Sequence, residues 1–86
     1  MAKKQEHAAD RLRQFDTLKQ KHPDAMLLFR KGDFYEMYRE DAVKAAAVLA
    51  ITLTSRVFPG EKDPVKYTLF PYHALDVYLP KLIRSG

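Results

Sequence analysis

Hydrophobic residues recur at helical spacing near both ends of the chain. Towards the N-terminus this spacing predicts a helix over residues 6–22, ended by Pro23 because the residue before a proline is pushed towards extended geometry. The last amphipathic pattern predicts a helix over residues 72–85, with Pro80 inside it and Gly86 at its C-cap position. Two helices are therefore expected to bracket the fold.

Between these helices, the pattern first predicts a β-hairpin over residues 25–38. Residues 25–29 form an unbroken apolar run, typical of a strand buried on both faces. Residues 30–33 follow as a turn, in which Gly32 can adopt a conformation that other residues resist. Residues 34–38 then predict the second strand.

The second half of the chain adds one helix and two strands. The alanine-rich segment 39–50 predicts a helix, and residues 51–54 alternate as in a strand with one wet face. Residues 58–64 contain Pro-Gly and Asp-Pro and are expected to form a loop, before a strand over residues 65–69. The order is α-β-β-α-β-β-α, which predicts an α/β (α+β) fold with a small mixed β-sheet flanked by helices.

Length and composition predict a single domain over residues 1–86, with residues 1–5 disordered because they have little to bury. A chain that ends on its own helix cap suggests an excerpt of a longer one. The net charge of +4 is a mild bias towards polyanions. Cysteine is absent, and no apolar run reaches the roughly 18 residues of a membrane span, so a cytoplasmic setting is expected.

Conventional catalytic and metal-binding patterns are missing. The three histidines are scattered, and none has a second ligand at metal spacing. A lone Gly32 does not make a phosphate-binding loop, which needs several glycines before a helix. We therefore expect no catalytic residue, no metal site and no cofactor in this domain, and a protein that is not an enzyme.

Phe34 and Glu36 are the candidate binding residues. In a strand, side chains two positions apart share a face, so this aromatic ring and carboxylate lie roughly 7 Å apart on one side. Tyr35 and Met37 face the other way and are the better core candidates. From the pattern alone, Phe34 in the core and Glu36 as a solvated edge residue is the commoner arrangement. A binding pair is the alternative.

Motifs along nearly the whole chain from Leu12 are similar to the N-terminal domain of the MutS family. The matching residues, in order, are His22-Pro23, Leu28-Phe29, Arg30, Gly32-Asp33-Phe34-Tyr35-Glu36, Asp41-Ala42, Leu49, Ile51-Thr52-Leu53-Thr54, Arg56, Pro71-Tyr72-His73-Ala74 and Tyr78-Leu79. Gly-Asp-Phe-Tyr-Glu and Pro-Tyr-His-Ala at this separation are specific to that family.

The resemblance implies recognition of mismatched or distorted duplex DNA, in DNA mismatch repair. In that family a Phe-x-Glu pair enters the minor groove, where the ring stacks on a mispaired base and the carboxylate bonds to it. These roles fall on Phe34 and Glu36, both presented to the base. The carboxylate can bond a base acceptor only when protonated, and in its charged form it repels sound duplex. Possible phosphate contacts around the pair are Arg30, Lys31, Arg39 and Arg56.

Three positions depart from the family pattern. Thr68 and Leu69 stand where a small residue and a glycine are usual, and Pro80 is unusual in the last helix. The expected partners are distorted double-stranded DNA and the remaining domains of a parent protein, and no membrane is expected. ATP and magnesium would be used only by those other domains. A structural or protein-interaction module that keeps the fold without reading bases is the main alternative. A general basic duplex binder, which needs no Phe wedge, is another.

Overall fold

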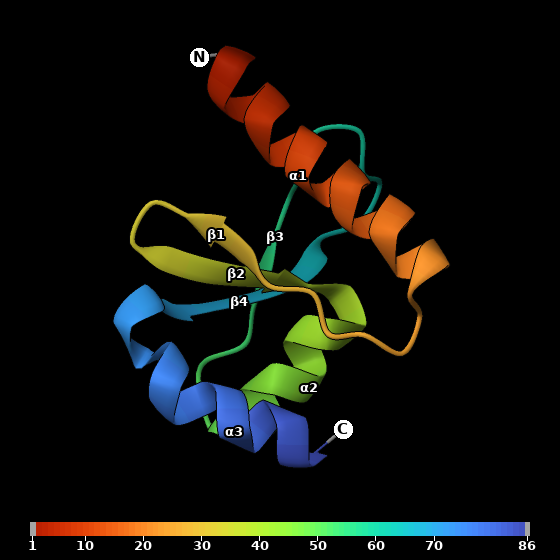
Figure 1. The fold of residues 1–86 in the computed structure, drawn as a ribbon. Coiled ribbons are helices and arrows are strands. Elements are labelled where there is room, and N and C mark those ends of the chain that lie inside the picture. Colours follow the sequence, from red (N-terminus) through yellow and green to blue (C-terminus); the bar gives the residue numbers. More distant parts are fainter. Residues whose placement is uncertain (1, 86) are drawn as a thin grey trace.

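The computed structural model of the chain describes residues 2–85, with side chains from residue 9 onward. Three helices, one short 3-10 helix and four strands follow the predicted order (Figure 1). Their bounds are α1 (Ala2–Lys21), β1 (Phe29–Lys31), β2 (Phe34–Tyr38), α2 (Arg39–Leu49), β3 (Thr54–Arg56), β4 (Val65–Pro71), η1 (Tyr72–Ala74) and α3 (Leu75–Ser85). The helix α1 therefore begins inside the segment 1–5 for which the composition predicts disorder.

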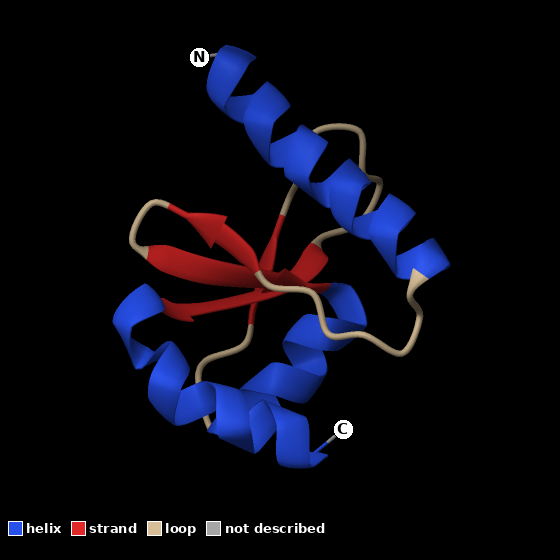
Figure 2. Cartoon of the chain, in the orientation of Figure 1, coloured by secondary structure: helices blue, strands red, loops and turns tan. Residues whose placement is uncertain are grey.

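The strands form one sheet in the order β1-β2-β4-β3, and each neighbouring pair is antiparallel. Helix α1 crosses one face of this sheet, and α2 and α3 cover the other (Figure 2). We call these the α1 face and the α2/α3 face. The expected small α/β domain, a sheet flanked by helices, is thus confirmed, whereas the expectation of a mixed sheet is wrong, because every pair of strands is antiparallel.

Each face of the sheet carries its own hydrophobic core, since side chains alternate between faces along a strand. The core under α1 consists of Leu12, Phe15, Tyr38, Phe58 and Val65. The core under α2 and α3 consists of Met37, Ala42, Ala45, Leu49, Phe70 and Leu82. Adjacent residues of β2 therefore serve opposite cores, which fixes the register of the strand that carries the candidate site.

Two predicted strands are shorter in the structure than their patterns suggest. The predicted strand over residues 25–29 is wrong for residues 25–28, because regular pairing begins only at Phe29, opposite Glu36. The predicted strand over residues 51–54 is wrong for residues 51–53, because β3 begins at Thr54. There, the hydroxyl of Thr68 donates a hydrogen bond to the carbonyl of Thr52 at 2.6 Å, in place of a backbone ladder.

The predicted turn over residues 30–33 is wrong for Arg30 and Lys31, because both pair with β2 as part of β1 and the turn is confined to residues 32–33. The remaining elements match their predictions closely. Residues 58–64 form the expected loop, and β4 continues two residues past its predicted end to Pro71. The final segment opens with η1 and continues as α3 with Pro80 inside it. Across residues 2–85, no helix has the length and apolar character needed to cross a membrane.

Candidate nucleic-acid interface

The tight turn of the β1–β2 hairpin places Phe34 at the outer end of the sheet. Gly32 occupies the left-handed region with φ 57°, which glycine adopts without steric cost. Directly after the turn, Phe34 begins β2 between Lys31 of β1 and Pro71 of β4. Its side chain is 42% exposed. The expected exposure of this ring is confirmed, whereas its contact with DNA stays a prediction.

The alternation along β2 also agrees with the prediction. Phe34, Glu36 and Tyr38 share the α1 face, where Tyr38 joins the core under α1. Met37 is fully buried in the opposite core, and Tyr35 packs against it. The aromatic ring and the carboxylate of the candidate pair therefore lie on one face, as their spacing predicts.

Glu36 departs from the expectation that the pair is presented together, because it is only 2% exposed. The hydroxyl of Tyr38 donates a hydrogen bond to Oε1 at 2.6 Å, and that of Tyr67 donates one to Oε2 at 3.2 Å. Arg11 Nε of α1 lies 3.5 Å from Oε1, and Lys31 Nζ lies 3.9 Å from Oε2. Helix α1 and the two tyrosines thus cover a carboxylate that the strand alone would leave open.

The two tyrosine hydroxyls remain hydrogen-bond donors to this carboxylate over a wide pH range. Burial raises the pKa of Tyr38 well above its usual value, and the adjacent Glu36 raises it further. Burial likewise raises the pKa of Tyr67, again with the charge of Glu36 acting in the same direction. A buried charge needs such partners, because desolvation without them is costly. In this conformation Glu36 is fully engaged within the protein.

Arg30, predicted as a phosphate contact, lies on the other side of the hairpin. It pairs in register with Tyr35, whose side chain belongs to the α2/α3 face. Its guanidinium stacks 4.1 Å from the centre of the Tyr72 ring, and its Nε donates a hydrogen bond to the carbonyl of Gly32 at 2.6 Å. Arg30 therefore clamps the turn against η1, although its side chain stays exposed.

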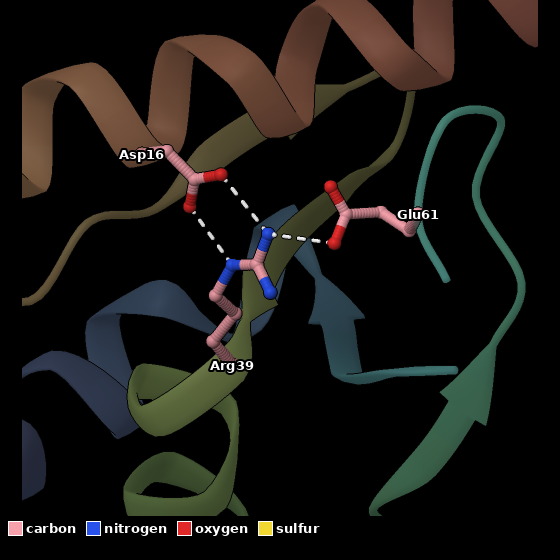
Figure 3. Close-up of polar contacts among 3 residues, drawn as sticks. All are labelled: Asp16, Arg39 and Glu61. Carbon is pink, nitrogen blue, oxygen red and sulfur yellow. Dashed lines mark hydrogen bonds and ion pairs between the residues drawn. The ribbon is translucent and has the colours of Figure 1, made fainter. Parts of the chain in front are cut away.

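Arg39, another predicted contact, follows the inner end of β2, five residues from Phe34. Its Nε and one terminal nitrogen donate to the carboxylate of Asp16 at 2.8 and 3.0 Å (Figure 3). The same terminal nitrogen donates to Glu61 at 3.2 Å. These carboxylates, Asp16 first, raise the pKa of Arg39, which is charged in any case. Arg39 ties α1 to the loop before β4, and the structure does not bring it to the hairpin end.

Lys31 and Arg56 share the α1 face with the candidate pair. Lys31 lies opposite Phe34 in the ladder, and its side chain is 45% exposed. Arg56 lies over the rings of Phe58 and Tyr67, 5.1 and 5.6 Å from their centres. We define the Glu36 cluster as Glu36, Tyr38, Tyr67, Arg11 and Lys31. Of the four predicted cations, Lys31 therefore belongs to this cluster and Arg56 lies beside it.

Sequence reasoning missed three members of this cluster. Tyr38 could have been found, because it follows Glu36 by two residues and must share its face. Tyr67 could have been found only with the register that pairs β2 with β4. Arg11 lies 25 residues from Glu36 on a helix whose crossing over the sheet no local pattern reveals.

Fold and site together define a small three-layer α/β domain that projects an aromatic ring from the end of a central strand, above a covered carboxylate. The family model "MutS domain I" matches residues 10–86. The chain belongs to the MutS domain I family.

Curated relatives agree with this assignment. The chain is 57% identical over 75 residues to the DNA mismatch repair protein MutS of Phocaeicola vulgatus, a match that covers 87% of the chain and 8% of the relative. It is 59% identical to the protein of that name from Bacteroides fragilis, covering 87% and 9%. With the protein from Christiangramia forsetii it is 51% identical over 85 residues, covering 99% and 10%. The chain thus spans a tenth or less of each relative's length.

Proposed function

We propose that this domain takes part in DNA mismatch repair by recognising mismatched or distorted duplex DNA, with Phe34 inserted into the minor groove and Glu36 bonding to the same base. The observation that carries the proposal is the exposed ring of Phe34 at the end of a strand held on both sides. Membership in the MutS domain I family supports it, as do the relatives named DNA mismatch repair protein MutS. On this proposal the domain itself is not an enzyme and uses no cofactor.

The proposed wedge exploits the weakness of a mispair. A mispaired base is easily unstacked, so inserting a ring beside it costs less than in sound duplex. Stacking on an aromatic ring returns roughly 1–3 kcal/mol per base and tolerates any base. The position of Phe34 suits this role, because β2 is hydrogen-bonded to β1 and β4 and therefore holds the ring rigidly. The domain would thus favour distortion over sequence.

The experiment that tests this proposal compares Phe34→Ala with the unchanged chain. We expect the substitution to lower affinity for a duplex with a single mispair by roughly 1–3 kcal/mol while affinity for matched duplex stays almost unchanged. NMR titration with short matched and mispaired duplexes at low salt, where phosphate contacts strengthen binding, measures both values. Ile83→Ala is the matched control, because Ile83 is 68% exposed on α3, in the layer across the sheet.

Equal losses on both duplexes, or no loss on either, would contradict a stacking role. A thermal melt of each variant separates the loss of a DNA contact from the loss of the fold. Because Phe34 lies outside both hydrophobic cores and is 42% exposed, we expect its replacement to lower the melting temperature only slightly.

A second candidate function is that of a structural or protein-interaction module without base reading. The burial of Glu36 favours it, since a carboxylate engaged by two hydroxyl groups and two cations serves the fold as it stands. The same experiment decides between the candidates. If the domain is such a module, the unchanged chain should show no preference for mispaired over matched duplex. Phe34→Ala would then have no preference to remove.

A further inference from the structure

Arg11 approaches Glu36 from helix α1, for which the sequence pattern predicts no part in the site. Its Nε lies 3.5 Å from Oε1 of Glu36, and its side chain is 21% exposed. Within the part of the chain whose side chains the structure describes, Arg11 Nε is the one buried side-chain nitrogen without a hydrogen-bond partner. The guanidinium is therefore drawn towards an anion without completing a hydrogen bond to it.

Glu36, by contrast, does not depend on Arg11 for its hydrogen bonds. Tyr38 and Tyr67 each donate one to the carboxylate, one to either oxygen. Arg11 and Lys31 stand at 3.5 and 3.9 Å and add two positive charges to one negative charge. The cluster therefore carries one cation in excess, and Lys31, 45% exposed, opens it to solvent on the side of Phe34.

We propose that Arg11 is a contact for DNA phosphate and that Glu36 masks Arg11. The carboxylate occupies the place of a phosphate, and Arg11 and Lys31 become available to the DNA backbone only when Glu36 leaves them. The inference rests on the proposed DNA binding at the hairpin end, although not on the preference for a mispair. A guanidinium binds phosphate through charge-assisted hydrogen bonds. A phosphate of DNA can approach Arg11 with more freedom of geometry than the carboxylate of Glu36, which is fixed on β2. Turning Glu36 towards a base would thus strengthen the hold on the backbone in the same step.

The test is the salt dependence of binding to matched duplex, which reports how many cations contact phosphate. Each such contact steepens the slope of log affinity against log salt by about 0.9. We expect Glu36→Gln to steepen the slope by about 0.9 to 1.8 relative to the unchanged chain, for one or two released cations. Adding Arg11→Gln to Glu36→Gln should take about 0.9 away again. Arg11→Gln alone should change the slope by less than half as much.

Two controls identify the cation. Arg11→Lys in the Glu36→Gln background keeps the charge and should retain the steep slope. Arg13→Gln removes an equal charge two residues along α1, where the side chain is 69% exposed, and should have the same effect in both backgrounds. If Arg11→Gln also acts equally in both backgrounds, or if Glu36→Gln leaves the slope unchanged, Glu36 does not mask Arg11. A failure of the mispair preference in the Phe34→Ala experiment would leave these slopes as they are.

The unchanged chain provides the same test should Glu36→Gln fail to fold. On addition of matched duplex, the NMR signals of the Arg11 Nε–H group and of the Glu36 carboxyl carbon are expected to stay in place, and on addition of a duplex with a single mispair they are expected to shift together. A shift of the Arg11 signal while the carboxyl signal stays in place would overturn the inference, and so would the reverse.

Discussion

Phe34 and Glu36 occupy neighbouring positions on one face and yet have opposite environments. The ring is 42% exposed, whereas the carboxylate two residues further in is 2% exposed. A strand rises about 3.3 Å per residue, so the edge of the protein layer falls between them, roughly 7 Å apart. The two residues of the proposed pair therefore differ in what they need: Phe34 is ready to stack, and Glu36 must first exchange its partners.

At the residue scale, Tyr38 makes the free energy of unfolding depend on pH in the alkaline range. Its pKa is raised above the ordinary value of 10.0, so the folded protein keeps a proton that the unfolded chain releases. This contribution to stability is fully present below about pH 10 and is lost as the pH rises further. We expect the free energy of unfolding to fall above about pH 10, and to fall less in Tyr38→Phe.

Urea denaturation at neutral and at alkaline pH measures both effects of this substitution. At neutral pH the variant should be less stable by about 1–3 kcal/mol, because Glu36 stays buried with one donor fewer. Tyr72→Phe, at an exposed tyrosine, should retain the alkaline decline of the unchanged chain. An alkaline decline that is as steep in Tyr38→Phe would place its cause elsewhere.

At the scale of elements, periodicity predicted the order and the faces but not the lengths of the edge strands. Residues 25–28 do alternate, since Met26 and Leu28 pack in one core and Leu27 in the other. Residues 25 and 26 lack a ladder because β2 ends at Tyr38, where the chain turns into α2 through Arg39 at φ 54°. Nearer the sheet, the N–H of Leu27 donates to the carboxylate of Asp41 at 3.0 Å instead of to β2. Pairing depends on the partner strand, which a local pattern does not contain.

The same limit explains the candidate site. The face shared by Phe34 and Glu36 follows from the spacing of two residues alone. The exposure of Phe34 is expected from the family resemblance, because the pattern alone favours a place in the core. The burial of Glu36 depends on Arg11 and Tyr67, which are brought together by the crossing of α1 and by the register of β4. Long-range packing decides what a short motif can show to a partner.

The end of helix α2 offers a direct test at this scale. Ala50 ends the helix in the left-handed region at φ 56°, and its N–H donates to the carbonyl of Ala46. This conformation costs a residue with a Cβ about 1–2 kcal/mol, and glycine avoids that cost at the expense of some backbone entropy. Ala50→Gly should therefore raise the free energy of unfolding by about 0.5–1 kcal/mol.

Ala47→Gly is the matched control for this prediction. Ala47 is also exposed, but it lies inside α2, where glycine should lower the free energy of unfolding by about 1 kcal/mol. Urea denaturation of the two variants should thus move in opposite directions. Destabilisation of similar size at both positions would show that relief of the left-handed conformation does not matter at Ala50.

At the scale of the whole molecule, charge limits what the domain can achieve alone. The net charge is +4, and Arg39 is tied to two carboxylates while Arg30 clamps the turn. Of the four predicted phosphate contacts, only Lys31 and Arg56 are then left on the face of the candidate pair, and a surface on one side of the duplex does not hold it bent. We expect the 86-residue chain to bind DNA with a dissociation constant on the order of 10⁻⁴ M or weaker at physiological salt.

An NMR titration with short duplexes measures affinities in this range. Shifts should gather on the hairpin end and on the α1 face, and should fade as salt is added. Tight binding that is insensitive to salt would mean that the main source of affinity lies elsewhere than in phosphate contacts.

The aromatic content of the chain makes the Glu36 cluster visible to light. The protein has no tryptophan, so its near-ultraviolet absorption and emission come mainly from five tyrosines. Tyr38 and Tyr67 are stacked, with ring centres 6.0 Å apart, and both donate to the same carboxylate. Departure of Glu36 from this pair would change the surroundings of two of the five chromophores at once. The unlabelled protein therefore contains its own optical reporter of whether the carboxylate is held or released.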